Sequence, residues 1–396
     1  MARYPRVREQ HIAVFGASGS GKTVLVSSFF GPTQEGSYSN DLWNLVADDT
    51  GQGNRLYQNF LGMRDHATAP LPTRFDATTY HFSVKLKGGD NAAAKTRPFD
   101  ALRLAWHDYP GEWFEESPSS EEEATRRVDT FRSLLRSDVA LFLVDGQKLL
   151  DYAGEEERYL KSLMTNFRQG LLRLKEDLLA DQERLVEFPR IWILALSKAD
   201  LFPDWDVYSF RDLVVAKAAE HVDGLRETLQ DLVDTPEALS VGEDFMLLSS
   251  AKFELSSAAP EGTGKIDVTQ RVGLDLILPV ASLLPLERRV QWGERMEIPR
   301  KVVDTLADGA DTLAAVLVGG GPVLEKLMAK IPVVGPLARK AAIPMLVQAV
   351  KMSQSQLQEM NARARADHDH LTASLTQFKL DLDAGVKDRL LIRSLK

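Results

Sequence analysis

The residues best suited to chemistry lie at 16–23, which read Gly-Ala-Ser-Gly-Ser-Gly-Lys-Thr and follow the apolar run 12–15. A glycine, four residues and then Gly-Lys-Thr, between a strand and a helix, is typical of a phosphate-binding loop. Its glycines let backbone N–H groups turn inward toward a phosphate chain. Lys22 supplies a charge for the β- and γ-phosphates, and the Thr23 hydroxyl suits Mg²⁺. We expect nucleotide contacts from Gly16, Ser18, Gly19, Ser20, Gly21, Lys22, Thr23 and Val24.

The segment 108–112, Asp-Tyr-Pro-Gly-Glu, follows an apolar stretch at 101–107 that we predict to be a strand. A carboxylate at a strand end, three residues before a glycine, suits a Mg²⁺ site that faces a phosphate. Asp108 can hold the ion directly or through water, and the Gly111 N–H can bond the γ-phosphate and sense its loss. Glu112 can polarise water, repel an anionic γ-phosphate or lie in solvent, and the sequence leaves these alternatives open.

Ser197-Lys198-Ala199-Asp200 follows the strand predicted at 190–196. The Asp200 carboxylate can accept hydrogen bonds from guanine N1–H and the 2-amino group, a donor pair that adenine lacks, and would therefore select GTP over ATP. The aliphatic stem of Lys198 can cover the base, and the Ser197 hydroxyl can tie this segment to the phosphate-binding loop. The alternative is structural, with Asp200 capping a helix after a buried strand.

The segment 249–252 ends the strand predicted at 244–249 and suits the same base. Backbone N–H groups of such a loop can donate to guanine O6, where adenine offers no acceptor. The residues expected to provide this contact are Ser250, Ala251 and Lys252.

A threonine that closes over Mg²⁺ should precede the strand predicted at 79–86. Thr73 is our first choice and Thr78 the second. A long insertion, residues 31–78, leads to this strand, and loops of that length are usually functional or contain small elements of their own. Three arginines of the insertion can either stabilise phosphate charge or lie at the surface as ordinary charges: Arg55, Arg64 and Arg74.

Apolar strands alternate with helical patterns over the first 255 residues, which predicts an α/β fold with a doubly wound, mostly parallel sheet. The runs at 138–144 and 190–196 are apolar on both faces, as central parallel strands require. The strands at 79–86 and 101–107 should form an antiparallel hairpin at one sheet edge. Residues 41–61 look partly helical. Further helices are predicted at 22–30, 120–136, 155–180 and 206–233.

After about residue 262 no further strand is convincing, and helical segments follow at 273–292, 298–317, 322–331, 335–352 and 353–393. We therefore expect a nucleotide-binding domain at 1–262 and an all-helical C-terminal domain at 263–396. Residues 311–352 combine apolar runs with interleaved Lys and Arg and with Gly and Pro breaks. Such a segment can contact a membrane surface or pack on the first domain, and we favour packing.

The composition excludes several classes of function. The net charge is −9 and the pI is about 5.4, so no overall attraction to nucleic acid is expected. Cysteine is absent, which excludes disulfides, cysteine nucleophiles and thiolate metal sites. Residues 1–10 lack the apolar core of a secretion signal, and no 18-residue apolar run is present. The histidines at 11, 66, 81 and 107 lack metal-ligand spacing and should be structural.

In their order and strand-end placement, the segments 16–23, 108–111, 197–200 and 250–252 resemble the motifs of the TRAFAC-class P-loop GTPases. The hexapeptide 108–113, Asp-Tyr-Pro-Gly-Glu-Trp, is similar to the same segment of the YcjX-like GTP-binding proteins and the related bacterial double-GTPase groups. The resemblance implies a P-loop GTPase fold, with GTP/GDP and Mg²⁺ as ligands. It implies Lys22, Thr73 and Glu112 as catalytic residues and Thr23, Thr73 and Asp108 as metal ligands.

Two positions depart from the family pattern. Ser197 stands where Asn or Thr is usual, and Glu112 stands where small GTPases often carry a water-orienting glutamine. We therefore expect a cytoplasmic switch with slow hydrolysis, completed by an unknown protein partner or by a homo-oligomer, with the inner membrane face as an alternative location. Two other functions stay open: a membrane-associated, dynamin-like GTPase or GTP-controlled scaffold, and a nucleotide-binding module with little hydrolysis of its own.

Overall fold

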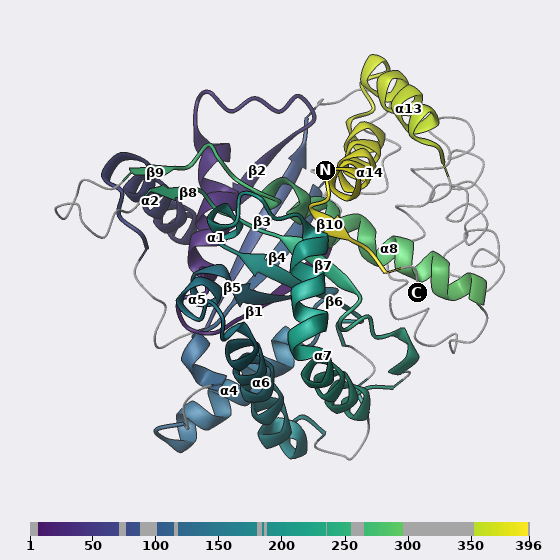
Figure 1. The fold of residues 1–396 in the computed structure, drawn as a ribbon. Helices are drawn as coiled ribbons and strands as arrows, with labels where there is room; N and C mark the ends of the chain where they lie inside the picture. Colours follow the sequence, from purple (N-terminus) through teal and green to yellow (C-terminus); the bar gives the residue numbers. More distant parts are fainter. Residues whose placement is uncertain are drawn as a thin grey trace.

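The computed structural model describes residues 7–70, 77–87, 101–114, 118–179, 184–185, 188–234, 236–254, 265–295 and 352–394. Within these ranges a central β-sheet lies between two layers of helices (Figure 1). The fold is therefore the doubly wound α/β arrangement of a P-loop GTPase, with helices in the described C-terminal part, and the predicted fold class is confirmed.

The described strands include an eight-stranded sheet in the order β10-β7-β6-β5-β1-β4-β3-β2. Strands β7, β6, β5, β1 and β4 pair in parallel, whereas β10, β3 and β2 are antiparallel to their neighbours. The parallel strands therefore bring their carboxyl ends to one edge of the sheet. The bounds are β1 (Val7–Phe15), β2 (Trp43–Ala47), β3 (Thr78–Leu86), β4 (Ala101–Asp108), β5 (Val139–Asp145), β6 (Ile191–Ser197), β7 (Asp244–Leu247) and β10 (Leu391–Ile392).

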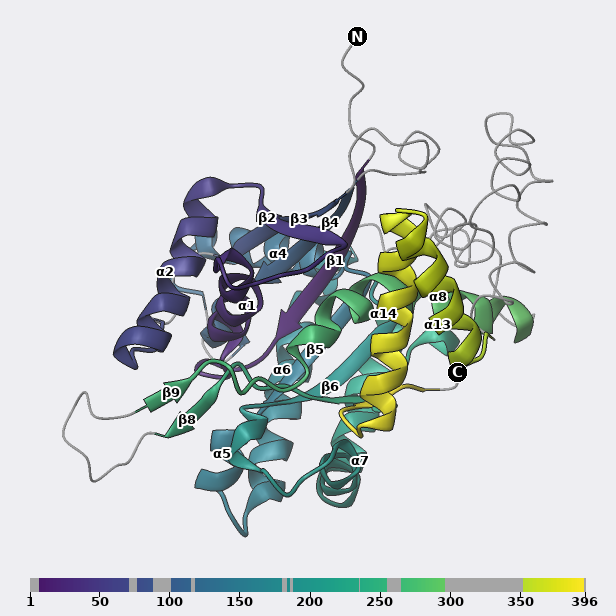
Figure 2. The ribbon, with the colours of Figure 1, turned by 90° about the horizontal axis from the view of Figure 1, so that it is seen from above.

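The helices divide between the two faces of the sheet (Figure 2). One face carries α1 (Lys22–Phe30), α2 (Thr50–His66), α8 (Ile277–Arg295) and α14 (His370–Lys387), with α13 (Gln354–Ala366) packed on α14. The other face carries α4 (Glu121–Leu134), α5 (Gly146–Asp151), α6 (Glu156–Leu178) and α7 (Val207–Leu232). Short 3-10 turns lie at η1 (Gly31–Gln34), η2 (Gly111–Phe114), η3 (Ala199–Leu201), η4 (Pro236–Ala238) and η5 (Leu274–Leu276), and β8 (Lys252–Glu254) pairs with β9 (Lys265–Asp267).

The two central strands, β5 and β6, are buried along their whole length, as the apolar runs at 138–144 and 190–196 predict. Alternate side chains of these strands enter two separate hydrophobic clusters, one on each face. For example, Ile193 belongs to the cluster beneath α1 and α8, whereas Trp192 stacks on Phe15 in the other cluster. Burial on both faces explains why these strands lack polar alternation.

The predicted hairpin is confirmed, because β3 and β4 pair in antiparallel fashion, but its position at the sheet edge is wrong. The edge strand is β2, which pairs with β3. The sequence predicts a partly helical region at 41–61, yet Trp43 and Leu45 are buried while Asn44 and Val46 are exposed. This two-residue alternation is that of a strand. The helical prediction holds for the rest of the segment, which forms α2.

The prediction of no strands after residue 262 is also wrong. Strand β9 pairs with β8, and β10 extends the main sheet beside β7. The segment 353–393 forms two helices rather than one, because Asp369 caps the start of α14. The helices predicted at 298–317, 322–331 and 335–352 lie outside the described residues, apart from Met352. The membrane contact of 311–352 and the domain division at residue 262 therefore stay predictions.

No helix within the described residues is long and apolar enough to span a bilayer.

A buried ion pair ties the C-terminal residues to the sheet. The Arg288 guanidinium pairs with the Asp244 carboxylate, and both side chains are almost fully buried. Arg288 also donates to the Ser394 carbonyl (2.6 Å), and the Ser394 N–H donates to Asp244 Oδ1 (2.7 Å). These contacts join α8, β7 and the chain after β10, so the C-terminal elements are integrated with the sheet.

We predict that Arg288→Met destabilises the fold by about 3–5 kcal/mol, because it leaves the Asp244 carboxylate buried without its cation. The measurement is urea unfolding followed by circular dichroism. Lys161→Met is the matched control, since it removes the exposed ion pair with Glu157 and should leave the urea midpoint unchanged. The double variant Arg288→Met/Asp244→Leu should recover much of the loss. Equal midpoints for Arg288→Met and wild type would contradict the structural role of this pair.

Candidate functional site

The phosphate-binding loop runs from the end of β1 to the start of α1. Gly19 and Gly21 have φ angles of 79° and 92°, a left-handed region that side chains other than glycine rarely adopt. The loop therefore curls back on itself and leads directly into the N-terminus of α1. Lys22 Nζ donates to the carbonyl oxygens of Gly16 (2.7 Å) and Ala17 (3.0 Å). Its charge thus lies inside the loop, where a phosphate chain would meet it.

The turn that follows β4 packs directly against this loop. The Gly16 N–H donates to the Tyr109 hydroxyl (3.0 Å), and the Tyr109 ring is fully buried beside Phe15 and Phe131. A Cβ at Gly111 would lie 2.3 Å from the Ser18 nitrogen, so only glycine permits this approach. The predicted γ-phosphate sensor therefore touches the phosphate-binding loop itself.

Thr23 and Asp108 form an oxygen pair below the loop. Thr23 Oγ1 donates to Asp108 Oδ2 (3.1 Å), while Asp108 Oδ1 is buried and has no hydrogen-bond partner among the described residues. Burial raises the pKa of the Asp108 carboxyl, and the Lys22 charge and the Thr23 hydrogen bond oppose that rise. A hydroxyl beside a carboxylate with an unsatisfied oxygen is a donor set that fits Mg²⁺.

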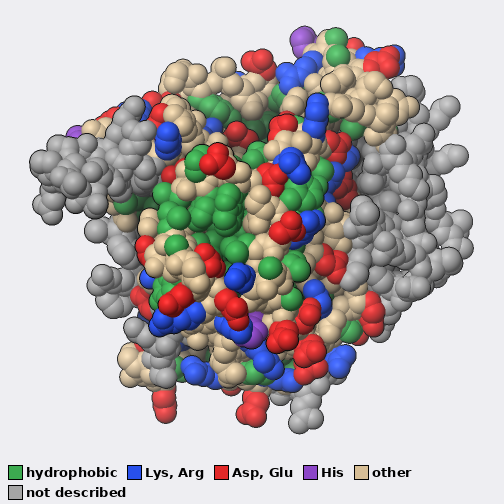
Figure 3. Space-filling model, in the orientation of Figure 1, with side chains coloured by type: hydrophobic (Ala, Val, Ile, Leu, Met, Phe, Trp, Pro, Cys, Tyr) green, Lys and Arg blue, Asp and Glu red, His purple; other side chains and the backbone are tan. Residues whose placement is uncertain are grey.

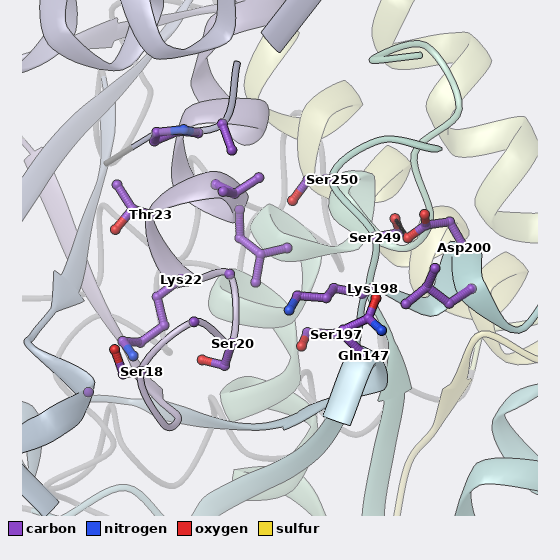
Figure 4. A pocket seen from close by; sticks show the side chains of 18 of the residues that line it. Ser18, Ser20, Lys22, Thr23, Gln147, Ser197, Lys198, Asp200, Ser249 and Ser250 are labelled. Atoms are coloured by element: carbon purple, nitrogen blue, oxygen red, sulfur yellow. Dashed lines mark hydrogen bonds between the residues drawn. The ribbon is translucent and has the colours of Figure 1, made fainter. Parts of the chain in front are cut away.

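A cavity of about 340 Å³ connects this loop with the ends of β6 and β7. Figure 4 shows Lys22 and Thr23 on one side of it and Lys198 and Asp200 on the other. Part of the wall is apolar, formed by Val24, Leu25, Ala69, Pro70 and Leu201. In the orientation of Figure 1, the space-filling view of Figure 3 shows hydrophobic side chains gathered near the positions of α1 and α5. The predicted residues that line the cavity are Ser18, Gly19, Ser20, Gly21, Lys22, Thr23, Val24, Gly111, Ser197, Lys198, Asp200 and Ser250.

Contacts of Asp200 and Lys198 with residues of neighbouring strands shape the far end of the cavity. Ser249 Oγ donates to Asp200 Oδ1 (2.6 Å) and Lys198 Nζ pairs with Asp145 (2.8 Å). Both contacts join neighbouring strands, since Asp145 ends β5 and Ser249 follows β7. The Ser197 hydroxyl donates to the Val144 carbonyl (3.2 Å) and not to the phosphate-binding loop, so the expected tie to that loop is wrong.

Several predicted residues lie away from the cavity wall. Asp108 lies beneath Thr23, Gly16 lies at the loop base, and Glu112 belongs to the half-exposed part of η2. Ala251 is fully buried, and Lys252 begins β8. Of the described residues predicted for the site, those that do not line the cavity are Gly16, Asp108, Glu112, Ala251 and Lys252.

The structure describes some of the threonine and arginine candidates of the insertion and not others. Thr73 and Arg74 lie outside the described residues, while Thr78 begins β3 opposite Asp108. Arg64 pairs with Glu35 (2.7 Å) and Asp65, as expected of a surface charge. The Arg55 guanidinium lies 5.9 Å from the centre of the Tyr80 ring.

Sequence reasoning missed four residues that shape the site: Tyr109, Asp145, Gln147 and Ser249. Asp145 and Gln147 follow β5, so the strand-end argument used for Asp108 and Asp200 would have found them. Tyr109 and Ser249 lie within the segments 108–112 and 249–252 but carry no spacing signal of their own. Their roles depend on partners from other strands.

Arg127 holds the η2 turn in place from the side of α4. Its Nη1 donates to the Trp113 carbonyl (2.9 Å), and its guanidinium lies 5.6 Å from the centre of the Trp113 ring. Glu123 pairs with Arg127 through a bond of 2.5 Å, and only 6 % of Arg127 is exposed. The turn that touches the phosphate-binding loop is therefore also tied to the helix after it.

Two of the histidines, His11 and His107, lie against each other. No group of three or more His, Asp or Glu side chains in the described ranges is arranged to hold a metal ion. His107 Nε2 lies 3.0 Å from His11 Nδ1, and His107 Nδ1 lies 3.0 Å from Thr79 Oγ1. Burial, together with the charges of His11 and His81, lowers the pKa of His107 from 6.5 to about 3.

We predict that His107 makes the fold less stable as the pH falls from about 6.5 toward 3. Over this window the unfolded chain binds a proton at residue 107 that the folded chain does not, so acid favours unfolding. His107→Gln should flatten this part of the stability curve, measured by urea unfolding at several pH values. His66→Gln, at an exposed histidine of α2, should follow the wild type. Parallel curves for wild type and His107→Gln would refute the prediction.

One of two comparisons with known proteins found a family for this chain. A search of curated proteins found no match. The sequence model of the family described as Double-GTPase 2 matches residues 10–264, which include the phosphate-binding loop and all the cavity-lining segments. Membership of such a family indicates that the protein binds and hydrolyses a guanine nucleotide. The match spans well over half of the chain, and the chain therefore belongs to the Double-GTPase 2 family.

Proposed function

We propose that the protein is a Mg²⁺-dependent switch that binds GTP, hydrolyses it slowly and changes its contacts with a protein partner when the γ-phosphate is lost. The observation that carries this proposal is the single cavity that joins Lys22, Gly111 and Asp200. A phosphate chain, a γ-phosphate sensor and a purine base require such groups at separate points of one site.

Asp200 is the proposed guanine reader. The Ser249 hydroxyl donates to one carboxylate oxygen of Asp200, which orients the group. A charged carboxylate can accept from guanine N1–H and the 2-amino group. Ser250 also lines the cavity, which supports the proposed contact between this loop and guanine O6.

Lys22 is the proposed β- and γ-phosphate ligand. Its ammonium is held by two loop carbonyls, so phosphate oxygens would replace these acceptors without moving the charge out of the loop. Thr23 and Asp108 would hold Mg²⁺, with Thr73 as the proposed third group. The ion supplies neutralisation of phosphate charge when it is bound.

Glu112 and the η2 turn are the proposed link between hydrolysis and signalling. Gly111 touches Ser18, and Arg127 ties Trp113 to α4, so a shift of the turn would reach α4. Glu112 is half-exposed beside Gly111, where its carboxylate could orient water. We propose that a partner or a second copy completes this arrangement, which accounts for a slow basal rate. Because the turn contacts both the phosphate-binding loop and α4, we favour a switch over a module that binds nucleotide without hydrolysing it.

We predict that Asp200→Asn weakens GTP binding about a hundredfold, because it removes a charged acceptor of two hydrogen bonds. The same change should improve binding of xanthosine triphosphate, whose 2-oxo group accepts from the new amide. Fluorescent-nucleotide titrations measure both affinities, with Asp204→Asn as an exposed control nearby. Equal affinity of the wild type for ATP and GTP would refute the guanine assignment.

We predict that Glu112→Ala lowers the GTP turnover number by about 10²-fold while the affinity for GTP changes little. Lys22→Ala should instead abolish measurable GTP binding. Phosphate production at saturating GTP and equilibrium binding distinguish these effects. If Glu112→Ala turns over GTP at the wild-type rate, Glu112 is a solvent-facing residue and water is oriented by another group.

A further inference from the structure

A second cavity, of about 390 Å³, lies on the other side of the phosphate-binding loop. The loop residues 16–18 form one wall, Tyr109 and Gly111 form a second, and residues from β5, α5 and α6 line the remainder. Lys198, Asp200 and Ser250 do not line it, although α5 contributes Gln147 to the first cavity and Lys148 to the second. This cavity is therefore not a continuation of the guanine end of the nucleotide site.

The polar groups of the second cavity include three that can donate hydrogen bonds. Lys148 comes from α5, and Ser162 and Asn166, four residues apart on α6, face the cavity together. No Asp or Glu among the described residues lines this cavity. The side chains of these three residues are exposed and form no hydrogen bond or ion pair with the part of the chain that the structure describes. An ammonium, a hydroxyl and an amide without a carboxylate suit a small oxyanion.

The partition between the two cavities is thin. Ser18, Tyr109 and Gly111 line both of them. The backbone of Gly111 rests against the backbone of Ala17 and Ser18 at this partition. Under the proposed function, Gly111 contacts the γ-phosphate, so the bond that breaks lies close to the partition.

We propose that the second cavity is an oxyanion-binding site that takes inorganic phosphate, and that it receives the phosphate released from GTP beyond Gly111. Phosphate is a small tetrahedral oxyanion that Lys148, Ser162 and Asn166 can bind together. The binding site stands on its own residues, and only the origin of the phosphate depends on the proposed GTPase activity. Phosphate in the second cavity would hold Gly111 away from Ser18. The contact between Gly111 and Ser18 would form again when the phosphate leaves.

The binding part is tested with inorganic phosphate and the nucleotide-free protein. The line width of the phosphate ³¹P resonance is followed during titration, and Lys148→Ala should weaken binding about tenfold, as expected for loss of one charge-assisted contact. Lys148→Arg should retain binding. Lys161→Ala, which removes a lysine of α6 that does not line the cavity, is the matched control. Equal binding by wild type, Lys148→Ala and Ser162→Trp, which fills the cavity, would overturn the site.

The origin of the phosphate is tested in a single turnover of GTP. Cleavage is measured by acid quench and free phosphate by a fluorescent phosphate sensor. A delay between the two in the wild type, shortened in Lys148→Ala, supports passage through the cavity. If phosphate binding depends on Lys148 but the delay does not, the oxyanion comes from solution and the release route is overturned. If no GTP is cleaved, the proposed function fails while the ³¹P titration still decides the binding site.

Discussion

The Gly16 N–H and the Tyr109 hydroxyl lie 3.0 Å apart because β1 and β4 are parallel neighbours in register. Ala13 pairs with His107, so β1 and β4 end at the same edge of the sheet, close to each other. The phosphate-binding loop and the 109–111 turn must then share one small volume. Buried packing of Tyr109 and the absence of a side chain at Gly111 make that possible. The proposed metal pair, phosphate sensor and second cavity all depend on this contact.

The proposed guanine end is built by the same principle from different strands. β5, β6 and β7 end side by side, and their polar side chains pair across strands as Lys198 with Asp145 and Asp200 with Ser249. These pairs restrain long side chains before a ligand arrives, which reduces the entropy lost on binding. They also connect the cavity to β7, and through β7 to the buried Asp244–Arg288 pair and the C-terminal strand.

Sequence patterns were informative where one property dominated. The continuous apolar runs of β5 and β6 identified central strands, and the Gly-rich loop between a strand and a helix predicted the phosphate site. The patterns failed where pairing with a neighbouring strand decided whether a segment became a strand. Residues 43–47 became an edge strand because β3 offered unpaired backbone groups, and β10 is a two-residue strand whose formation depends on β7. Neither partner is visible in the local sequence.

By itself the sequence determined the phosphate-binding loop, the order of the four motifs and the doubly wound fold, because glycine spacing and strand-length apolar runs act over short distances. Only the tertiary structure decided that Ser249 orients Asp200, that Asp145 pairs with Lys198, and that Ser18 and Gly111 separate two cavities. These relations join residues that are far apart in the chain. Their physical origin is strand register, which sets which side chains meet at the carboxyl edge of the sheet.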